Sequence, residues 1–181
     1  MWLVANRPWS TMVGWLPDVA RYQLTLIGEH ESLSMPLHTQ AAAPKIRLFL
    51  VDDEPMVRKG FRLFASLQSD MTVCGEAASE GAALREIAAL KPDLVVVDLG
   101  LKGGTGLEVI KELHRVHPQI RILVFSMHDE AFYVEQALGA GAHGYVTKEE
   151  GTETALQAIR SLMQGKRYLS AKAAAKMTGM G

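Results

Sequence analysis

From residue 45 onward, short runs of apolar residues alternate with segments in which apolar residues recur every three or four positions. Each run is rich in β-branched or aromatic residues and is too short for a helix, which is typical of a β-strand. The segments between the runs predict amphipathic helices; in the first of them, Val57, Phe61, Phe64 and Leu67 recur at helical spacing. The expected strands cover 46–51, 71–77, 94–98, 120–125 and 145–147.

Five strand–helix units therefore follow one another over residues 45–165. Strands that alternate with helices form a parallel sheet, and right-handed crossovers place the helices on both faces of that sheet. The expected fold class is α/β, a doubly wound parallel sheet of the form (βα)5. The first helix is expected to begin at Pro55, with Asp53 or Glu54 as its cap, and the last to end near Gly165.

The segments on either side of this domain have a different character. Residues 1–44 hold all three Trp residues and four of the seven Pro residues, without a clear period of 2 or 3.6. We expect them to form a poorly ordered N-terminal extension; the alternative is a partner-binding or membrane-surface segment carried by the Trp side chains. Residues 166–181 are expected to form a short C-terminal tail.

Composition and charge narrow the functional classes. The net charge of −1 gives no whole-chain case for attraction to nucleic acid or to a membrane surface. A single Cys among 181 residues excludes an internal disulfide framework and a Cys-based zinc cluster. No apolar run approaches the roughly 18 to 20 residues of a membrane span, and Arg7, Pro8 and Asp18 interrupt any signal-peptide core. The sequence therefore predicts a cytoplasmic protein without membrane contact.

Polar residues capable of chemistry stand where the predicted strands end. Ligands of open parallel sheets bind just outside the carboxyl ends of the strands. Taken singly, each such residue could be a helix cap, a turn residue or a solvated charge. Together they predict one site at a single edge of the sheet. The candidates are Asp52 and Asp53 after the first strand, Asp98 after the third, Ser126 after the fourth and Lys148 after the fifth.

Three carboxylates at one edge repel one another, and a bound divalent cation would relieve that repulsion. Mg²⁺ takes oxygen ligands and commonly binds through one or two carboxylates together with a phosphate. We expect Asp53 and Asp98 to be ligands of Mg²⁺. The backbone carbonyl of Gly100 is the candidate third ligand, and Asp52 is expected to act through water.

The same residues suit phosphoryl transfer to an aspartate. A free oxygen of Asp98 can attack phosphorus and form an aspartyl phosphate, which is a known form of covalent catalysis. Such a transfer needs mostly positioning and neutralisation of charge. Lys148 offers a compact positive charge for a phosphoryl oxygen, and Ser126 offers a small donor that can follow that oxygen.

These motifs resemble the receiver domain of bacterial two-component response regulators, and the resemblance covers residues 45–165. It implies a flavodoxin-like fold with strand order 2-1-3-4-5. The residues that carry it are Val51-Asp52-Asp53-Glu54-Pro55, Val97-Asp98-Leu99, Val124-Phe125-Ser126 and Gly144-Tyr145-Val146-Thr147-Lys148.

Carried over position by position, the resemblance assigns roles to the site residues. Asp98 would be the phosphoacceptor. Asp52 and Asp53 would form the acidic pair that holds Mg²⁺ together with Asp98. Ser126 would be the switch hydroxyl, and Lys148 the phosphate-binding lysine.

The resemblance also implies partners and a switch. The phosphoryl donor would be a phosphohistidine of a sensor histidine kinase, or a small phosphodonor such as acetyl phosphate. On phosphorylation Ser126 would move toward the phosphoryl group, and the aromatic side chain of Tyr145 would turn into the space that Ser126 leaves. The face of the fourth helix, fifth strand and fifth helix would change, and family members commonly form homodimers there. The chain would catalyse only its own phosphorylation and dephosphorylation, and would not otherwise be an enzyme.

Two departures from the family pattern resemble the NarL/LuxR subfamily. Glu149 stands where the family often has Pro after the lysine, and Lys102 stands where Pro is common four residues after the acceptor. That subfamily usually adds a helix-turn-helix DNA-binding domain, whereas here only residues 171–177 could add a short helix before Gly181. No direct DNA binding is therefore expected from this chain. The alternative is a truncated DNA-binding transcription regulator.

A further alternative is a phosphatase of the haloacid dehalogenase type, which also uses an aspartate nucleophile after a strand. That chemistry calls for a second Asp two residues after the nucleophile, and position 100 is Gly. The sequence therefore favours the receiver over the phosphatase.

Overall fold

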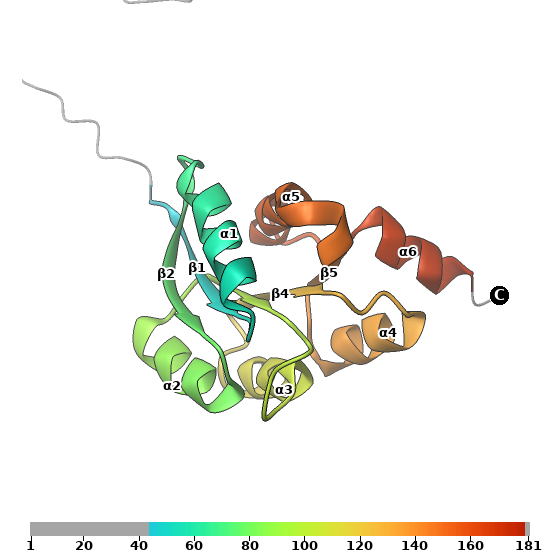
Figure 1. Ribbon diagram of the computed structural model, residues 1–181, viewed down its shortest axis with the longest axis horizontal. Coiled ribbons are helices and arrows are strands. Elements are labelled where there is room, and N and C mark those ends of the chain that lie inside the picture. The colour runs from blue at the N-terminus through green and yellow to red at the C-terminus, as the bar shows by residue number, and fades with distance from the viewer. Residues whose placement is uncertain (1–43, 180–181) are drawn as a thin grey trace, which may run out of the picture. The chain divides into compact units, whose positions relative to one another are not determined.

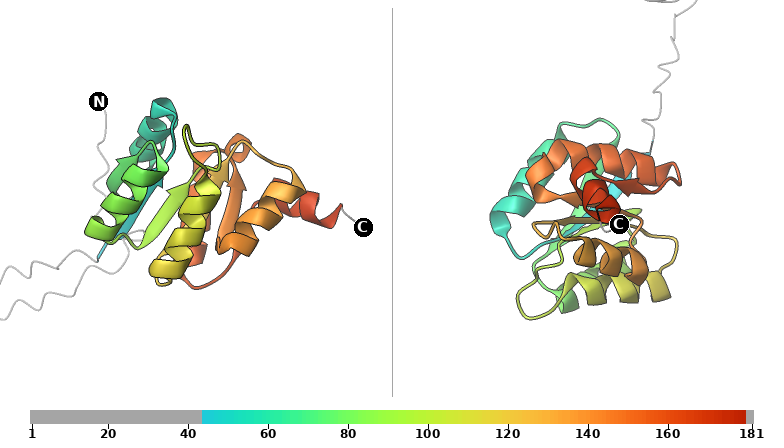
Figure 2. Two further views of the ribbon diagram at one scale, coloured as in Figure 1. Left: turned by 90° about the horizontal axis from the view of Figure 1, so that it is seen from below. Right: turned by 90° about the vertical axis from the view of Figure 1, so that its right-hand side faces the viewer.

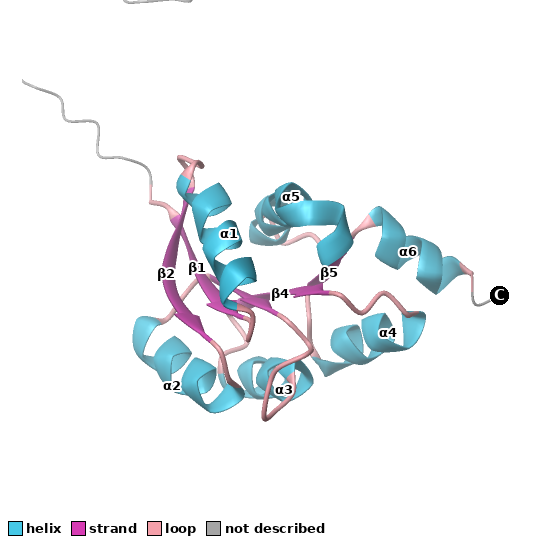
Figure 3. Ribbon diagram, in the orientation of Figure 1, coloured by secondary structure: helices cyan, strands magenta, loops and turns pink. Residues whose placement is uncertain are grey.

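The computed structural model describes residues 44–179, so the predicted N-terminal extension lies outside the described residues apart from Pro44. Strands and helices alternate along the described chain (Figures 1 and 3). The strands are β1 (Ile46–Val51), β2 (Met71–Ala77), β3 (Leu94–Val97), β4 (Arg121–Ser126), β5 (Gly144–Thr147) and β6 (Tyr168–Leu169). The helices are α1 (Pro55–Ser66), α2 (Glu80–Leu90), α3 (Gly106–Val116), α4 (Ala131–Ala140), α5 (Gly151–Met163) and α6 (Ala171–Thr178), with a 3-10 turn η2 (Lys148–Glu150) between β5 and α5.

The six strands form one sheet in the order β2-β1-β3-β4-β5-β6, and every neighbouring pair is parallel. The predicted α/β class and the order 2-1-3-4-5 are therefore confirmed. Figure 1 shows α1 and α5 on one face of the sheet and α2, α3 and α4 on the other. No described helix combines the length and the apolar composition that crossing a membrane requires.

Alternate residues along each strand divide the core into two halves. Phe49 and Val51 of β1 pack in the cluster formed with α2, α3 and α4. Leu48 and Leu50, between them in the chain, pack in the cluster formed with α1 and α5. Because side chains of a strand point alternately to opposite faces, a strand covered by helices on both sides is apolar at every position. This is why the central strands appear in the sequence as unbroken apolar runs.

The first helix buries fewer of its apolar residues than its helical spacing suggests. Phe61 is only 2% exposed and packs edge-on against Phe125, with ring centroids 5.6 Å apart. Leu67, by contrast, lies just beyond the helix as its C-cap and is 72% exposed. Helical spacing thus identified the helix, but it did not separate the residues that face the core from those that stay exposed.

The segment expected to be a tail contributes two elements. Tyr168 and Leu169 form β6, which pairs in parallel with Gly144 and Tyr145 of β5. The side chain of Ser170 then caps α6 by accepting a hydrogen bond from the backbone N–H of Ala173 at 3.4 Å. Helix α6 packs against α4 and β5, beside the sheet edge seen at the right of Figure 1 and facing the viewer in the right panel of Figure 2.

The turn that enters α3 brings two backbone segments into contact at Gly106. Its N–H donates to the carbonyl oxygen of Leu99 at 3.1 Å. A Cβ at this position would lie 2.0 Å from the carbonyl oxygen of Asp98, a separation that no side chain can adopt. The return of the chain beneath Asp98 therefore requires glycine at this position.

We expect Gly106→Ala to lower the free energy of unfolding by about 3 kcal/mol, because the backbone around Asp98 must shift to admit a methyl group. The matched control is Gly60→Ala, since no atom lies within 4 Å of a Cβ built there in the middle of α1. This control should raise the free energy of unfolding by up to about 1 kcal/mol, through higher helix propensity. Urea denaturation followed by circular dichroism measures both, and equal stabilities of the two variants would contradict the close contact.

Candidate functional site

The site is built around Asp98, which directly follows the buried strand β3. Its backbone N–H donates to the carbonyl oxygen of Val51 at 2.8 Å, which continues the pairing of β1 with β3 by one residue. The side chain of Asp98 is almost fully buried. Asp52, which follows β1, is brought beside it because Val51 and Val97 are opposite each other in the sheet.

Lys148 joins these two carboxylates from the end of β5. Its Nζ lies 2.8 Å from Oδ2 of Asp52 and 2.8 Å from Oδ2 of Asp98. The Lys148 side chain is only 7% exposed, so these contacts are shielded from water. Burial alone would lower the pKa of Lys148, but its hydrogen bonds to the two carboxylates and their charges outweigh burial and raise that pKa.

Ser126 and Gly100 bind the other carboxylate oxygen of Asp98. The Oγ of Ser126, at the end of β4, donates to Oδ1 of Asp98 at 2.6 Å. The backbone N–H of Gly100 approaches the same oxygen at 3.3 Å. One oxygen of Asp98 is therefore held by a hydroxyl and an amide, and the other by an ammonium group.

Tyr145 of β5 is fully buried beside this site. Its hydroxyl donates to the backbone carbonyl oxygen of His128 at 2.6 Å, and the His128 ring stacks on Tyr133 with centroids 4.2 Å apart. Burial first, and then the nearby charge of Asp98, raise the pKa of the Tyr145 hydroxyl, so it remains a neutral donor. The structure thus combines a buried Tyr145 with a Ser126 hydroxyl that already bonds Asp98.

A third carboxylate approaches from the start of α1. Oxygen atoms of Asp52, Glu54 and Asp98 lie within 4.8 Å of one another, and Glu54 Oε1 is 3.5 Å from Lys148 Nζ. Sequence reasoning missed Glu54 as a site residue because it considered it only as a helix cap. In the structure Glu54 occupies the N-cap position, but its side chain makes no capping hydrogen bond, so it is available to the site. The feature of the sequence that could have identified Glu54 is its position directly after the two acidic residues Asp52 and Asp53.

Asp53 lies to one side of this acidic cluster. Its carboxylate is 12% exposed and stands 3.6 Å from Nζ of Lys102, whose side chain is 88% exposed. Asp53 does not belong to the three-carboxylate group that the described residues form. The structure therefore brings together Asp52, Asp98 and Lys148 as expected, and sets Asp53 against a solvent-exposed lysine.

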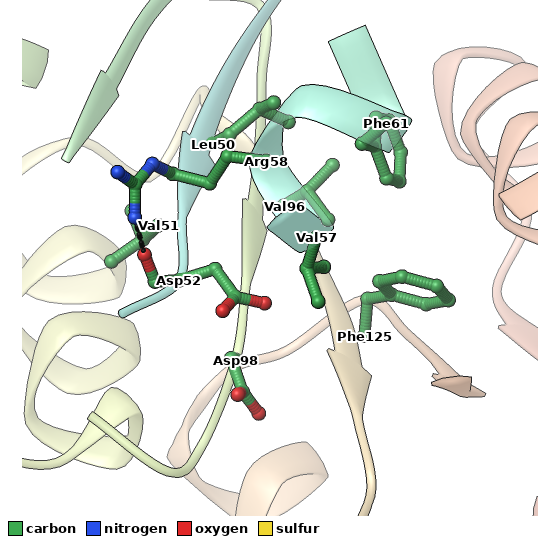
Figure 4. A pocket seen from close by; sticks show the side chains of 9 residues that line it. All are labelled: Leu50, Val51, Asp52, Val57, Arg58, Phe61, Val96, Asp98 and Phe125. Carbon is green, nitrogen blue, oxygen red and sulfur yellow. Dashed lines mark hydrogen bonds between the residues drawn. The ribbon is translucent and has the colours of Figure 1, made fainter. Parts of the chain in front are cut away.

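Asp52 is held from two sides. Its Oδ1 accepts from the backbone N–H of Glu54 at 2.8 Å, and its carbonyl oxygen accepts from Nη1 of Arg58 at 2.5 Å. Behind it lies a small cavity of about 10 Å³ with apolar walls that include Phe61 and Phe125 (Figure 4). Burial against these walls raises the pKa of Asp52, although its hydrogen bond from Lys148 opposes the shift.

The donor set of the cluster fits a magnesium ion. Three carboxylates, two of them buried, face a single ammonium group, so negative charge is in excess where water is largely excluded. Hard divalent cations prefer oxygen ligands and relieve this repulsion.

The described residues contain no cis peptide bond, so the bond from Lys148 to Glu149 is trans.

Known proteins share this fold and part of this sequence. Residues 48–160 match the response regulator receiver domain. Over 133 residues the chain is 37% identical to the response regulator GacA of Pseudomonas viridiflava. This match covers 73% of this chain and 62% of that protein. It is 35% identical over 133 residues to the uncharacterized transcriptional regulatory protein YxjL of Bacillus subtilis (strain 168), covering 74% of this chain and 61% of that protein. The chain thus spans about six tenths of the length of these relatives.

A solved structure matches over the same region. The crystal structure of a two-component response regulator of the LuxR family from Aurantimonas sp. SI85-9A1 superposes with a TM-score of 0.72 and 36% identity. The match covers 75% of this chain and 96% of that chain. The similarity therefore extends over almost the whole of that structure.

We expect Lys148→Met to lower the free energy of unfolding by about 3 kcal/mol in metal-free buffer at pH 7, because it leaves two buried carboxylates without their cation. Adding Asp98→Asn to this variant should recover part of the loss, since it removes one of the unpaired charges. Lys166→Met, at an exposed position, is the matched control and should change stability by less than about 0.5 kcal/mol. A Lys148→Met variant as stable as this control in urea denaturation would show that the buried contacts contribute nothing net.

Proposed function

The chain belongs to the family of response regulator receiver domains, of the NarL/LuxR type, and we propose that Asp98 is the residue on which it accepts a phosphoryl group. The observation that carries the proposal is the setting of Asp98. One oxygen is held by Ser126, the other by Lys148, and two further carboxylates lie beside them. Receiver domains take part in phosphorelay signalling, and this setting supports that role here.

The proposed chemistry is an in-line displacement at phosphorus. An oxygen of Asp98 forms a bond to phosphorus, while the bond from phosphorus to the leaving nitrogen or oxygen of the donor breaks. Lys148 neutralises charge on the phosphoryl group, and Ser126 can donate to one of its oxygens. Mg²⁺, held by Asp52, Asp98 and one further acid, would supply positive charge that offsets the carboxylates and the phosphoryl oxygens. The chain acts on its own phosphorylation and dephosphorylation only.

The proposed donor is the phosphohistidine of a sensor histidine kinase, or a small molecule such as acetyl phosphate. The family membership of the chain supports this donor, and we propose that the reaction takes place in the cytoplasm.

The second candidate function is that of a DNA-binding transcription regulator, favoured by the names and greater length of curated relatives such as YxjL. Reading the coding sequence beyond residue 181 tests it, and the lack of any helix-turn-helix there would exclude this candidate.

We further propose that phosphorylation stabilises the arrangement in which Ser126 bonds Asp98 and Tyr145 is buried. Both features are present in the structure, and a phosphoryl group on Asp98 would give the Ser126 hydroxyl a charged acceptor. A homodimer through the face of α4, β5 and α5 would then include α6, which packs against α4 and β5. Met127 and Phe132 supply exposed apolar surface beside this face. Light scattering with and without beryllofluoride tests the dimer, and an unchanged mass would exclude it.

Incubation of the full chain with acetyl phosphate and Mg²⁺ should add one phosphoryl group as an acid-stable, base-labile acyl phosphate. The group should be absent in Asp98→Asn, because an amide cannot act as the nucleophile. Intact-protein mass spectrometry before and after treatment with hydroxylamine measures it. Asp70→Asn is the matched control, because Asp70 pairs with Arg160 away from the site, and it should be labelled like the wild type. A wild-type chain that stays unlabelled with acetyl phosphate and with an autophosphorylated kinase would refute the proposal.

Either Asp53 or Glu54 could be the third carboxylate that binds Mg²⁺, and substitutions distinguish the two. We expect Asp53→Asn to weaken Mg²⁺ binding at least about tenfold, and to weaken it more than Glu54→Gln does. The reason is that Asp53 is mostly buried and its only described ion pair is with an exposed lysine, which contributes little. Titration of MgCl₂ followed by amide chemical shifts measures the affinities. Lys102→Met, the control, should bind Mg²⁺ at least as tightly as the wild type. A larger effect of Glu54→Gln would instead assign Glu54 as the ligand.

A further inference from the structure

Helix α6 is anchored directly to the strand that carries the switch aromatic. The backbone N–H of Ser170 donates to the carbonyl oxygen of Tyr145 at 2.9 Å. Ala173 is fully buried in the core cluster that also contains Tyr145, and Met177 packs against that cluster. The start and one face of α6 therefore rest on the receiver core next to Tyr145.

One lysine of α6 connects two loops of the site. Lys172 forms ion pairs with Asp129, at 2.9 Å, and with Glu149. Asp129 lies three residues after Ser126 in the loop that leads to α4, and Glu149 directly follows Lys148. Each of these loops thus carries both a residue that bonds Asp98 and a residue that bonds Lys172.

Two further contacts strengthen the connection. Lys176, one helical turn after Lys172, stands 3.7 Å from the same carboxylate of Asp129. Glu150 accepts from the backbone N–H of Lys172 at 3.1 Å with one oxygen, and from the hydroxyl of Thr147 at 2.8 Å with the other. Thr147 is the last residue of β5, so Glu150 links the start of α6 to the strand end that directly precedes Lys148.

We propose that α6 is a strap whose docking through Lys172 is coupled to occupation of Asp98 by a phosphoryl group. The inference rests on the proposed function of Asp98. The docked strap occurs in the structure together with the Ser126–Asp98 hydrogen bond and the buried Tyr145. A phosphoryl group that binds Ser126 and Lys148 holds both loops in place, and so holds Asp129 and Glu149 at the spacing that Lys172 bridges.

The physical properties of these contacts suit a reversible strap. The ion pairs are partly exposed, with about a third of the Lys172 side chain accessible, so each contributes little by itself. Docking also buries Ala173, so release of α6 would uncover apolar surface on α4 and β5. Because linkage is reciprocal, a strap stabilised by phosphorylation must itself raise the affinity of the site for the phosphoryl group or its analogue.

Hydrogen exchange of the full chain, with Mg²⁺ and with or without beryllofluoride, tests the coupling. Beryllofluoride should slow amide exchange in residues 171–178 of the wild type severalfold. Lys172→Met should lose this response in α6 and should bind beryllofluoride roughly two- to fivefold more weakly. Lys172→Arg should retain the response, since it can make the same ion pairs. Lys166→Met, an exposed lysine just before β6, is the matched control and should behave like the wild type.

The outcomes separate the strap from the proposed function. Acyl phosphate on Asp98 with unchanged exchange in α6, or a Lys172→Met variant that responds like the wild type, would overturn the strap alone. A wild-type chain that forms no acyl phosphate and binds no beryllofluoride would overturn both. Loss of the α6 response in Lys172→Met, with labelling of Asp98 retained, supports the coupling.

Discussion

The candidate site depends on one ammonium group that stands between two buried carboxylates. Lys148 contacts Asp52 and Asp98 at equal distances, in a place where few water molecules can share the charge. Burial disfavours the charged form of Lys148, but its hydrogen bonds to the two carboxylates outweigh burial and raise its pKa. For Asp52, burial outweighs the hydrogen bond from Lys148, and the pKa of this carboxyl is raised. With Glu54 nearby, the acids still outnumber the cation. The excess of negative charge is the feature of this cluster that fits a hard divalent cation.

The fold supplies this arrangement through strand register. In a parallel sheet, neighbouring strands end on the same side, so residues at or just after the ends of β1, β3, β4 and β5 meet without any long loop to bring them together. The glycine at position 106 allows the chain to turn back against the carbonyl of Asp98. The backbone hydrogen bonds of the sheet thus fix where each site residue starts, and the side chains lie close enough to contact one another.

Much of this could be predicted from the sequence, and what could not has physical reasons. Strands buried on both faces form unbroken apolar runs in the sequence, so the strand Leu94–Val97 and the position of Asp98 after it could be predicted. A strand of two residues such as β6 leaves no periodic pattern, and its pairing with β5 depends on contacts distant in the chain. Glu54 lies beside Lys148 because its side chain makes no capping hydrogen bond at the N-cap of α1, and the local sequence does not predict this. Likewise, Leu67 shares the spacing of Phe61 but extends past the covered part of α1.

The short strand β6 has a consequence for how the molecule meets its neighbours. An exposed strand edge offers unpaired N–H and C=O groups on which another chain can build a sheet, and long flat edges are sites of aggregation. Here β5, which ends at the charged site, is covered by only two residues, after which the chain leaves the plane as a helix. A strand so short gives an incoming chain almost no template. At this border of the sheet, β6 therefore offers little backbone for uncontrolled strand addition.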